Sequence, residues 1–159
     1  MKKLMSEDPD YNLWWLMLQM RRAMYKARSK ELFQYGTTPE ESGALFAIKA
    51  IGSRATPAEI ARWNLREHHT MSALLVRMEN KGLVKRTRDL ERKNSIRVTM
   101  TKKGREVYKQ AAKREAIHRI LSCLPKDQRE QLMSPLLRLR DKSLEEVNLR
   151  IKLIFPPAP

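Results

Sequence analysis

Apolar and polar positions follow two different periods in the middle of the chain. Residues 57–81 contain two stretches with the three-to-four-residue apolar spacing of a helix, separated by a short turn. Gly82 ends the helical pattern, and two short runs that are typical of strands follow it, joined by a highly charged loop. These predicted elements are helices over residues 57–62 and 67–81, a turn at 64–66, strands over 83–88 and 95–101, and a loop at 89–94.

Longer helices are predicted on both sides of this block. Residues 10–33 carry apolar side chains on two helical faces, so this helix needs two surfaces to cover them, and we expect one to belong to a partner subunit. A turn and an N-cap followed by Pro39 introduce a helix that ends near residue 51. Thr56 is predicted to cap the next helix, with Glu59 in capping-box spacing.

Two more helices are predicted after the strands. Thr101 caps the first of them, which continues to about residue 123, and the second reaches about residue 151. Pro135 lies inside the second helix and is expected to kink or divide it.

The order helix, turn, helix and hairpin defines a winged helix-turn-helix. We therefore predict a mainly α fold (α+β) with a short β-hairpin wing, because a lone helix fits the DNA major groove and a basic loop beside it can contact phosphates. The predicted domains are an N-terminal dimerisation helix (1–35), a winged helix-turn-helix DNA-binding domain (36–104), C-terminal dimerisation helices (105–155) and a tail (156–159).

Charge favours a polyanionic partner. The chain has 33 Lys and Arg against 18 Asp and Glu, a net charge of +15. Residues 77–109 hold twelve basic and four acidic residues, 12 − 4 = +8, so about half of the excess lies on the predicted hairpin and its flanks. A generic solvated surface is the alternative interpretation of this charge.

The second helix of the pair has the pattern of a DNA-recognition helix. Met71, Leu74, Leu75 and Met78 share one side, which is predicted to face the core, whereas the opposite side is small, polar and apolar without a central acid. Such a face suits contact with base edges, including thymine methyl groups and guanine. Packing against another protein is the alternative. The candidate contacts are Arg66, His69, Thr70, Ser72, Ala73, Val76 and Arg77.

The hairpin tip and the outer helices supply the remaining candidate contacts. Arg88, Arg92 and Lys93 are predicted to enter the minor groove or bind phosphates, with a flexible charged loop as the alternative. Helix-helix spacing near both ends of the chain predicts a dimer seam. Its candidate residues are Leu13, Met17, Met20, Leu144, Val147 and Ile151.

The ordered set of motifs resembles the MarR-type winged-helix transcription regulators. The matching pieces are Glu59-Ile60-Ala61, the run from His68 to Val84, and the run from Val98 to Gly104; the outer helices lie where that family has its own. The resemblance implies a two-fold homodimer held by the first and last helices. It also implies sequence-specific binding to a near-palindromic double-stranded DNA operator, usually as a repressor, with release by a small-molecule effector or by oxidation.

The chain departs from this family pattern at two places. The family has Asp-x-Arg just before its second wing strand, whereas here the acid is displaced to Asp89 or replaced by Glu91, and we assign the wing role to Arg92 and Lys93. Thiol-sensing members carry a reactive cysteine near the start of the first helix. The single cysteine here, Cys123, lies late in a helix and is expected to be an ordinary core thiol.

Other chemistry is not supported by the sequence. His68 and His69 are adjacent on a helix and point about 100° apart, and distant His118 does not complete a site, so no metal and no cofactor are predicted. No nucleophile-base set or glycine-rich phosphate loop indicates an enzyme. The tryptophans Trp14, Trp15 and Trp63 and the nine methionines either pack in a core or line a ligand cavity.

The expected location is the cytoplasm. No signal peptide precedes the first helix, and its apolar stretch is too short to cross a bilayer, so no membrane partner is predicted. The sequence thus predicts a homodimeric DNA-binding transcriptional regulator. The competing hypothesis is a winged-helix module that docks onto a protein without specific DNA binding.

Overall fold

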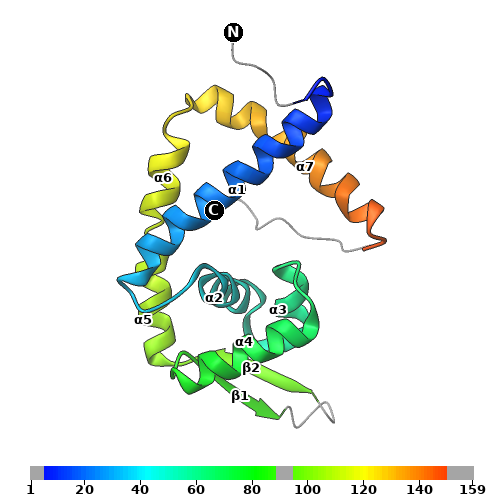
Figure 1. Ribbon diagram of the computed structural model, residues 1–159. Helices are drawn as coiled ribbons and strands as arrows, with labels where there is room; N and C mark the ends of the chain where they lie inside the picture. Colours follow the sequence, from blue (N-terminus) through cyan, green and yellow to red (C-terminus); the bar gives the residue numbers. More distant parts are fainter. Residues whose placement is uncertain (1–5, 89–94, 150–159) are drawn as a thin grey trace.

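The computed structural model describes residues 6–88 and 95–149. Its helices lie to one side of a single small sheet, and Figure 1 shows α2, α3, α4 and the two strands grouped below, with α1, α6 and α7 above and α5 linking the two groups. The elements are α1 (Pro9–Phe33), α2 (Pro39–Ile51), η1 (Gly52–Arg54), α3 (Pro57–Trp63), α4 (His68–Asn80), β1 (Val84–Arg88), β2 (Ile96–Met100), α5 (Lys102–Ala111), α6 (Glu115–Leu121) and α7 (Lys126–Glu146). The predicted mainly α winged helix-turn-helix fold is confirmed.

Side-chain caps start the helices of the lower group. Thr38 and Thr56 each accept a hydrogen bond from a backbone amide three residues on, and the Glu at that position accepts one from the cap's own amide. These reciprocal capping boxes fix the first turns of α2 and α3. Thr101 caps α5 through Gly104 N, as the sequence predicts.

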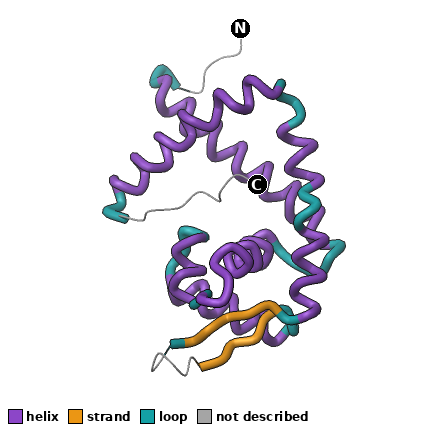
Figure 2. Tube along the Cα trace, turned by 180° about the vertical axis from the view of Figure 1, so that it is seen from behind, coloured by secondary structure: helices purple, strands orange, loops and turns teal. Residues whose placement is uncertain are grey.

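The sheet is a two-stranded antiparallel hairpin. Its register pairs Val84 with Met100 and Arg88 with Ile96, and Figure 2 shows both strands along one edge of the molecule. A further bond from Val98 N to Ala55 O, 2.9 Å long, ties β2 to the segment between η1 and α3. The hairpin is therefore anchored to the helix-turn-helix through its second strand.

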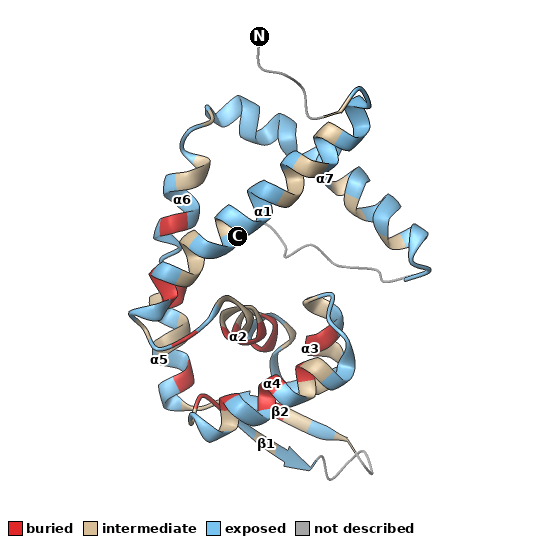
Figure 3. Cartoon of the chain, in the orientation of Figure 1, coloured by how far each residue is buried: buried red, intermediate tan, exposed pale blue. Residues whose placement is uncertain are grey.

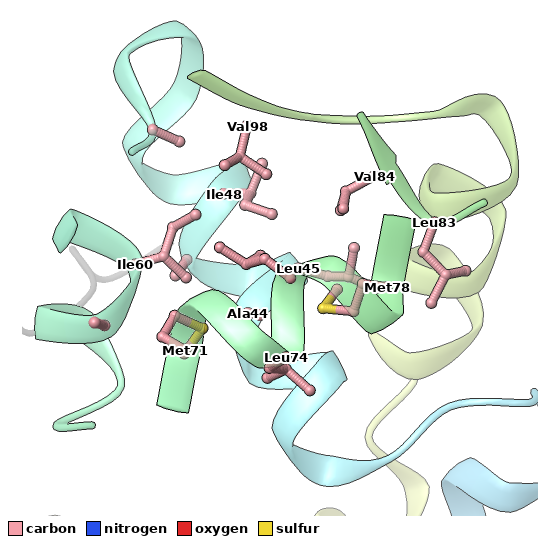
Figure 4. Packing of buried hydrophobic residues seen from close by; sticks show 14 residues of the cluster. Ala44, Leu45, Ile48, Ile60, Met71, Leu74, Met78, Leu83, Val84 and Val98 are labelled. Carbon is pink, nitrogen blue, oxygen red and sulfur yellow. The ribbon is translucent and has the colours of Figure 1, made fainter. Parts of the chain in front are cut away.

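The hydrophobic core lies inside the winged helix-turn-helix. Met71, Leu75 and Met78 of α4 have no exposed surface and pack against α2, α3 and both strands (Figure 4). The core-facing side predicted for this helix is confirmed. At the junction of the strands and α5, a Cβ on Gly104 would overlap the backbone carbonyl oxygen of Leu83, so only glycine fits this close approach.

The segment after the hairpin differs from the prediction. Residues 102–123 form two helices, α5 and α6, because Arg114 adopts a left-handed conformation at φ 55° and ends the regular helical path. The final helix ends at Glu146, earlier than expected, and continues through Pro135 without being divided. Cys123 is exposed, so its assignment to the core is wrong for this chain.

An ion pair on α1 connects the end of α5 to the start of α6. Arg28 donates to Ala111 O at 2.7 Å, at the end of α5. Glu31 accepts from Glu115 N at 2.9 Å and Ala116 N at 3.1 Å, at the start of α6, and pairs with Arg28 at 2.7 Å. The pair therefore caps one helix end with a cation and the next helix start with an anion, as the helix dipoles favour.

Candidate nucleic-acid interface

The exposed side of α4 is the main candidate surface for nucleic acid. With its apolar side in the core, α4 leaves His69, Ala73, Val76 and Arg77 exposed, and Ser72 partly exposed. The helix contains one acidic residue, Glu79, so the exposed side is uncharged except for its cation. A helix surface of this kind can approach base edges closely without repelling phosphates.

Arg66 precedes α4 and is positioned by a different helix. Its Nη2 lies 3.3 Å from Oε1 of Glu40, at the start of α2, and the same oxygen accepts a hydrogen bond of 2.7 Å from the hydroxyl of Tyr25. The preceding residue, Leu65, has φ 50°, so the turn between α3 and α4 is tight. The sequence placed Arg66 in the candidate surface but did not indicate either partner.

The hydrogen bond between Tyr25 and Glu40 shifts the pKa values of the two groups in opposite directions. Burial alone would raise the pKa of Glu40, but hydrogen bonds, above all from the Tyr25 hydroxyl, outweigh it and leave the pKa below its ordinary value. The hydrogen bond to Glu40 in turn raises the pKa of Tyr25. At neutral pH the carboxylate is therefore charged and the phenol retains its proton.

The wing is fixed to the end of α4 by a second ion pair. Glu79 accepts hydrogen bonds from Arg86 N and Arg86 Nε, both 2.8 Å long. These bonds lower the pKa of Glu79, since both stabilise its charged form. The predicted contact Arg88 is exposed at the end of β1, while Arg92 and Lys93 lie outside the described residues. The Glu79–Arg86 pair orients the hairpin relative to α4.

A third pair holds the C-terminal end of α4. Lys81 Nζ lies 2.7 Å from Oε1 of Glu41, whose side chain is buried in α2. Lys103 Nζ donates to the carbonyl of Lys81 at 2.8 Å. Two neighbouring acids of α2 therefore contact residues on either side of α4. Glu40 contacts Arg66 before the helix, and Glu41 contacts Lys81 after it.

Comparison with known proteins finds a family model that matches the central part of this chain. Residues 35–93, which include α2, α3, α4 and β1, match the model of the MarR family. The match covers α2 to β1 and does not extend to α1 or to the helices after the hairpin.

Solved structures share the fold over most of the chain. The ligand-free organohalide-sensing transcriptional regulator RdhR-CbdbA1625 matches with a TM-score of 0.83 at 23% identity, covering 100% of this chain and 99% of that one. Its form bound to 2,4-dichlorophenol gives 0.81 at 24%, with 91% and 86% covered. A MarR mutant from E. coli complexed with operator DNA gives 0.75 at 18%, with 80% and 92% covered. Among curated proteins, none matches this chain.

The outer helices of this chain expose many apolar side chains. In the described part of the chain, no side chain of α7 is buried, and Figure 3 shows α7 in the colours of exposed and intermediate residues. Of the predicted dimer residues, Leu13 and Met20 are exposed, Met17 and Leu144 are partly buried, and Val147 is exposed beyond the end of α7; Ile151 lies outside the described residues.

The apolar stripe of α7 begins earlier than the sequence analysis indicated. Its exposed members are Leu132, Met133, Leu136 and Leu139. Their spacing of three to four residues is that of a helix-helix seam, whereas the predicted seam residues Leu144, Val147 and Ile151 lie further along the chain. Pro135 lies within this stripe and does not end it, because α7 continues through the proline.

None of the three tryptophans, for which core packing or a ligand cavity was expected, is fully buried. Trp63 packs edge-on against Phe46, with ring centroids 6.2 Å apart, and the guanidinium of Arg114 lies 6.0 Å from the same Phe46 ring. Trp14 is exposed, so within this chain it belongs to no core. Among the described residues, no three His, Cys, Asp or Glu side chains are grouped to hold a metal ion, and no helix could cross a membrane.

Proposed function

We propose that this chain is a MarR-family transcriptional regulator, a homodimer that binds a near-palindromic double-stranded DNA operator in the cytoplasm and represses transcription. The observation that carries the proposal is the exposed side of α4, which is small, polar and apolar around Ala73 and lies opposite the fully buried Met71 and Met78. An α-helix presenting such a side can enter the major groove, with Arg77 able to bond a guanine or a phosphate.

DNA binding is tested by fluorescence anisotropy with genomic fragments selected by the purified protein. We expect affinity to fall steeply with salt, since neutralised phosphates release counterions. Changing Arg77 to Ala should weaken the preferred site by about 1–3 kcal/mol relative to a mismatched site if it reads a base. Lys113→Ala, which removes an exposed cation beyond α5, is the matched control. If the wild type shifts no duplex and instead retains a protein partner, the winged helix is a protein-docking module.

We also propose that the wing contacts phosphates through Arg92 and Lys93, which lie outside the described residues. Arg92→Ala and Lys93→Ala should each lower affinity for all sequences and reduce the slope of log affinity against log salt by about one unit. Unchanged slopes in both variants would remove the wing from the interface.

The homodimer proposal is supported by α7, which is too exposed to be stable as a separate element. Helices of this kind gain most of their stability from packing an apolar face. A second copy could cover Leu132, Leu136 and Leu139 together with exposed apolar residues of α1, and would place two α4 helices in successive major grooves about 34 Å apart.

The dimer is tested by light scattering combined with operator binding. Leu136→Glu should give a monomer with greatly weakened operator affinity, since a charge would enter an apolar seam. Ser134→Glu lies about 160° around the same helix and should remain dimeric. A wild-type protein that stays monomeric at micromolar concentration would refute this part of the proposal.

A small-molecule effector is proposed on the strength of the ligand-bound relative. That protein binds 2,4-dichlorophenol, and the present chain has its fold. Titrating phenolic compounds into the preformed complex tests the idea, with DNA release as the expected result. A complex that is unaffected by every compound in the panel counts against an effector of this chemical class.

A further inference from the structure

Side chains from three separate parts of the chain meet at one oxygen atom beside the turn between α3 and α4. Oε1 of Glu40, in the first turn of α2, accepts a 2.7 Å hydrogen bond from the Tyr25 hydroxyl of α1. The same atom lies 3.3 Å from Nη2 of Arg66, in the turn that leads into α4. The chain thus connects its first long helix to the start of its recognition helix through a single carboxylate.

The pair leaves Arg66 able to contact a second anion. A guanidinium carries five N–H groups in a planar fork, and the Glu40 contact uses only one of its terminal nitrogens. The Arg66 side chain retains 36% of its exposed surface, whereas that of Glu40 retains 22%. Glu40 therefore holds the guanidinium from the protein side, while about a third of the Arg66 side-chain surface, 36%, faces solvent.

Tyr25 limits the positions that the Glu40 carboxylate can take. A carboxylate at the start of a helix has several rotamers, and a hydrogen bond from a neighbouring element selects among them. Because the phenol donates to the same oxygen that faces Arg66, losing the phenol hydroxyl would free the carboxylate to turn away. The position of the guanidinium then depends on α1, although Arg66 and α1 share no direct hydrogen bond among the described contacts.

We propose that Glu40 is a positioning residue for a DNA phosphate contact made by Arg66, and that Tyr25 makes this contact depend on the placement of α1. The inference rests on the proposed function, because it requires α4 and its preceding turn to face DNA. The exposed apolar residues of α1 are also assigned to the dimer interface. A change in how the two subunits pack would therefore move Tyr25 and, through Glu40 and Arg66, alter the affinity for DNA.

The principal test is Tyr25→Phe, which removes one hydroxyl and no charge. We expect operator affinity to fall about two- to fivefold, the range given by a half-exposed ion pair that loses its fixed geometry. In an Arg66→Ala background the same change should have no effect, because the group being positioned is absent. Tyr11→Phe, which removes the hydroxyl of another exposed tyrosine on α1, should bind the operator like the wild type.

A second variant tests the carboxylate without altering the charge near DNA. Glu40→Asp keeps the anion but withdraws it by one methylene, so it should give a similar loss that also vanishes in the Arg66→Ala background. Thermal unfolding of each variant, measured at one protomer concentration, separates the positioning role from general destabilisation. A structural role alone would lower the melting temperature and leave the dependence on Arg66 absent.

Two results would overturn the inference while leaving the proposed function intact. One is a wild-type protein that binds its operator and a Tyr25→Phe variant that binds it equally well. The other is a loss in Tyr25→Phe that persists at the same size in the Arg66→Ala background. Failure of the wild type to bind any duplex would instead overturn the proposed function, and the present inference with it.

Discussion

Replacing Glu31 with Gln should destabilise this protein more than any other change of one acid to its amide on α1. The Glu31 side chain is 2% exposed and accepts hydrogen bonds from the first amides of α6, Glu115 N and Ala116 N, while pairing with Arg28. The substitution preserves shape and removes the charge. It leaves one carbonyl oxygen as an acceptor and turns an amide N–H₂ toward groups that are themselves donors.

The expected loss in the free energy of unfolding is about 3 kcal/mol. Removing one partner of a buried ion pair costs about 3–5 kcal/mol, because the remaining charge is left without a counter-ion. Hydrogen bonds to charged groups contribute about 1.5–3 kcal/mol each, and the Gln carbonyl can retain one of the two amide bonds. The lower end of the first range is therefore the better estimate. For a chain of this length it corresponds to a fall of about 6–12 °C in melting temperature.

The pH dependence provides an independent check of the same reasoning. Burial would raise the pKa of Glu31, but hydrogen bonds from Arg28, Ala116 N and Glu115 N outweigh it and leave the pKa below the ordinary value for a glutamate. A lowered pKa in the folded state means that the stabilisation is complete above the unfolded pKa and is lost as pH falls through the folded pKa. The wild type and the Gln variant should therefore converge in stability as the pH falls below about 4.5.

Urea unfolding followed by tryptophan fluorescence and circular dichroism measures both effects. The protomer concentration must be equal in all samples, because association would stabilise the folded state by mass action. Glu106→Gln, an exposed acid on α5, is the control and should change stability by no more than about 0.5 kcal/mol. The reasoning is refuted if Glu31→Gln is as stable as this control at neutral pH, or if its deficit stays constant on acidification.

Two further substitutions test the local structure around the recognition helix. Gly104→Ala should destabilise the protein by about 3 kcal/mol or prevent its folding, because the new methyl group would overlap the Leu83 carbonyl oxygen. The soluble yield and the urea midpoint measure this effect. A variant as stable as the wild type would contradict the close approach of Gly104 to Leu83. Thr56→Ala removes the capping box of α3 and should cost about 1 kcal/mol, measured by the same unfolding assay. Thr56→Ser should retain most of that stability, and equal losses in both variants would argue against the cap.

Local patterns in the sequence were sufficient for the winged helix-turn-helix. Apolar spacing predicted that Met71 and Met78 of α4 face the core, and Thr-x-x-Glu spacing predicted the capping box at Thr56. These features depend on residues within one or two helical turns of each other, so the backbone geometry links them directly to sequence spacing. The exposed side of α4 followed from the same periodicity, because it is the complement of the buried side.

Contacts between distant segments could not be predicted in this way. Arg28 bonds the carbonyl of a residue 83 positions later, and Tyr25 meets Arg66 only through Glu40. Charged residues on a helix surface have the same sequence pattern whether they face water or another element, so their partners depend on how the helices pack. For the same reason, the sequence did not predict that Cys123 is exposed.

What the sequence determined by itself was the order and type of the central elements and the two-sided character of α4, because both are consequences of side-chain periodicity along one stretch of backbone. What only the tertiary structure decided was the break between α5 and α6, the ion pairs that fix α4 and the wing, and the contacts that connect Tyr25 of α1 through Glu40 to Arg66 before α4. These features arise where elements far apart in the sequence meet, and their energies depend on distances and burial that no local pattern encodes.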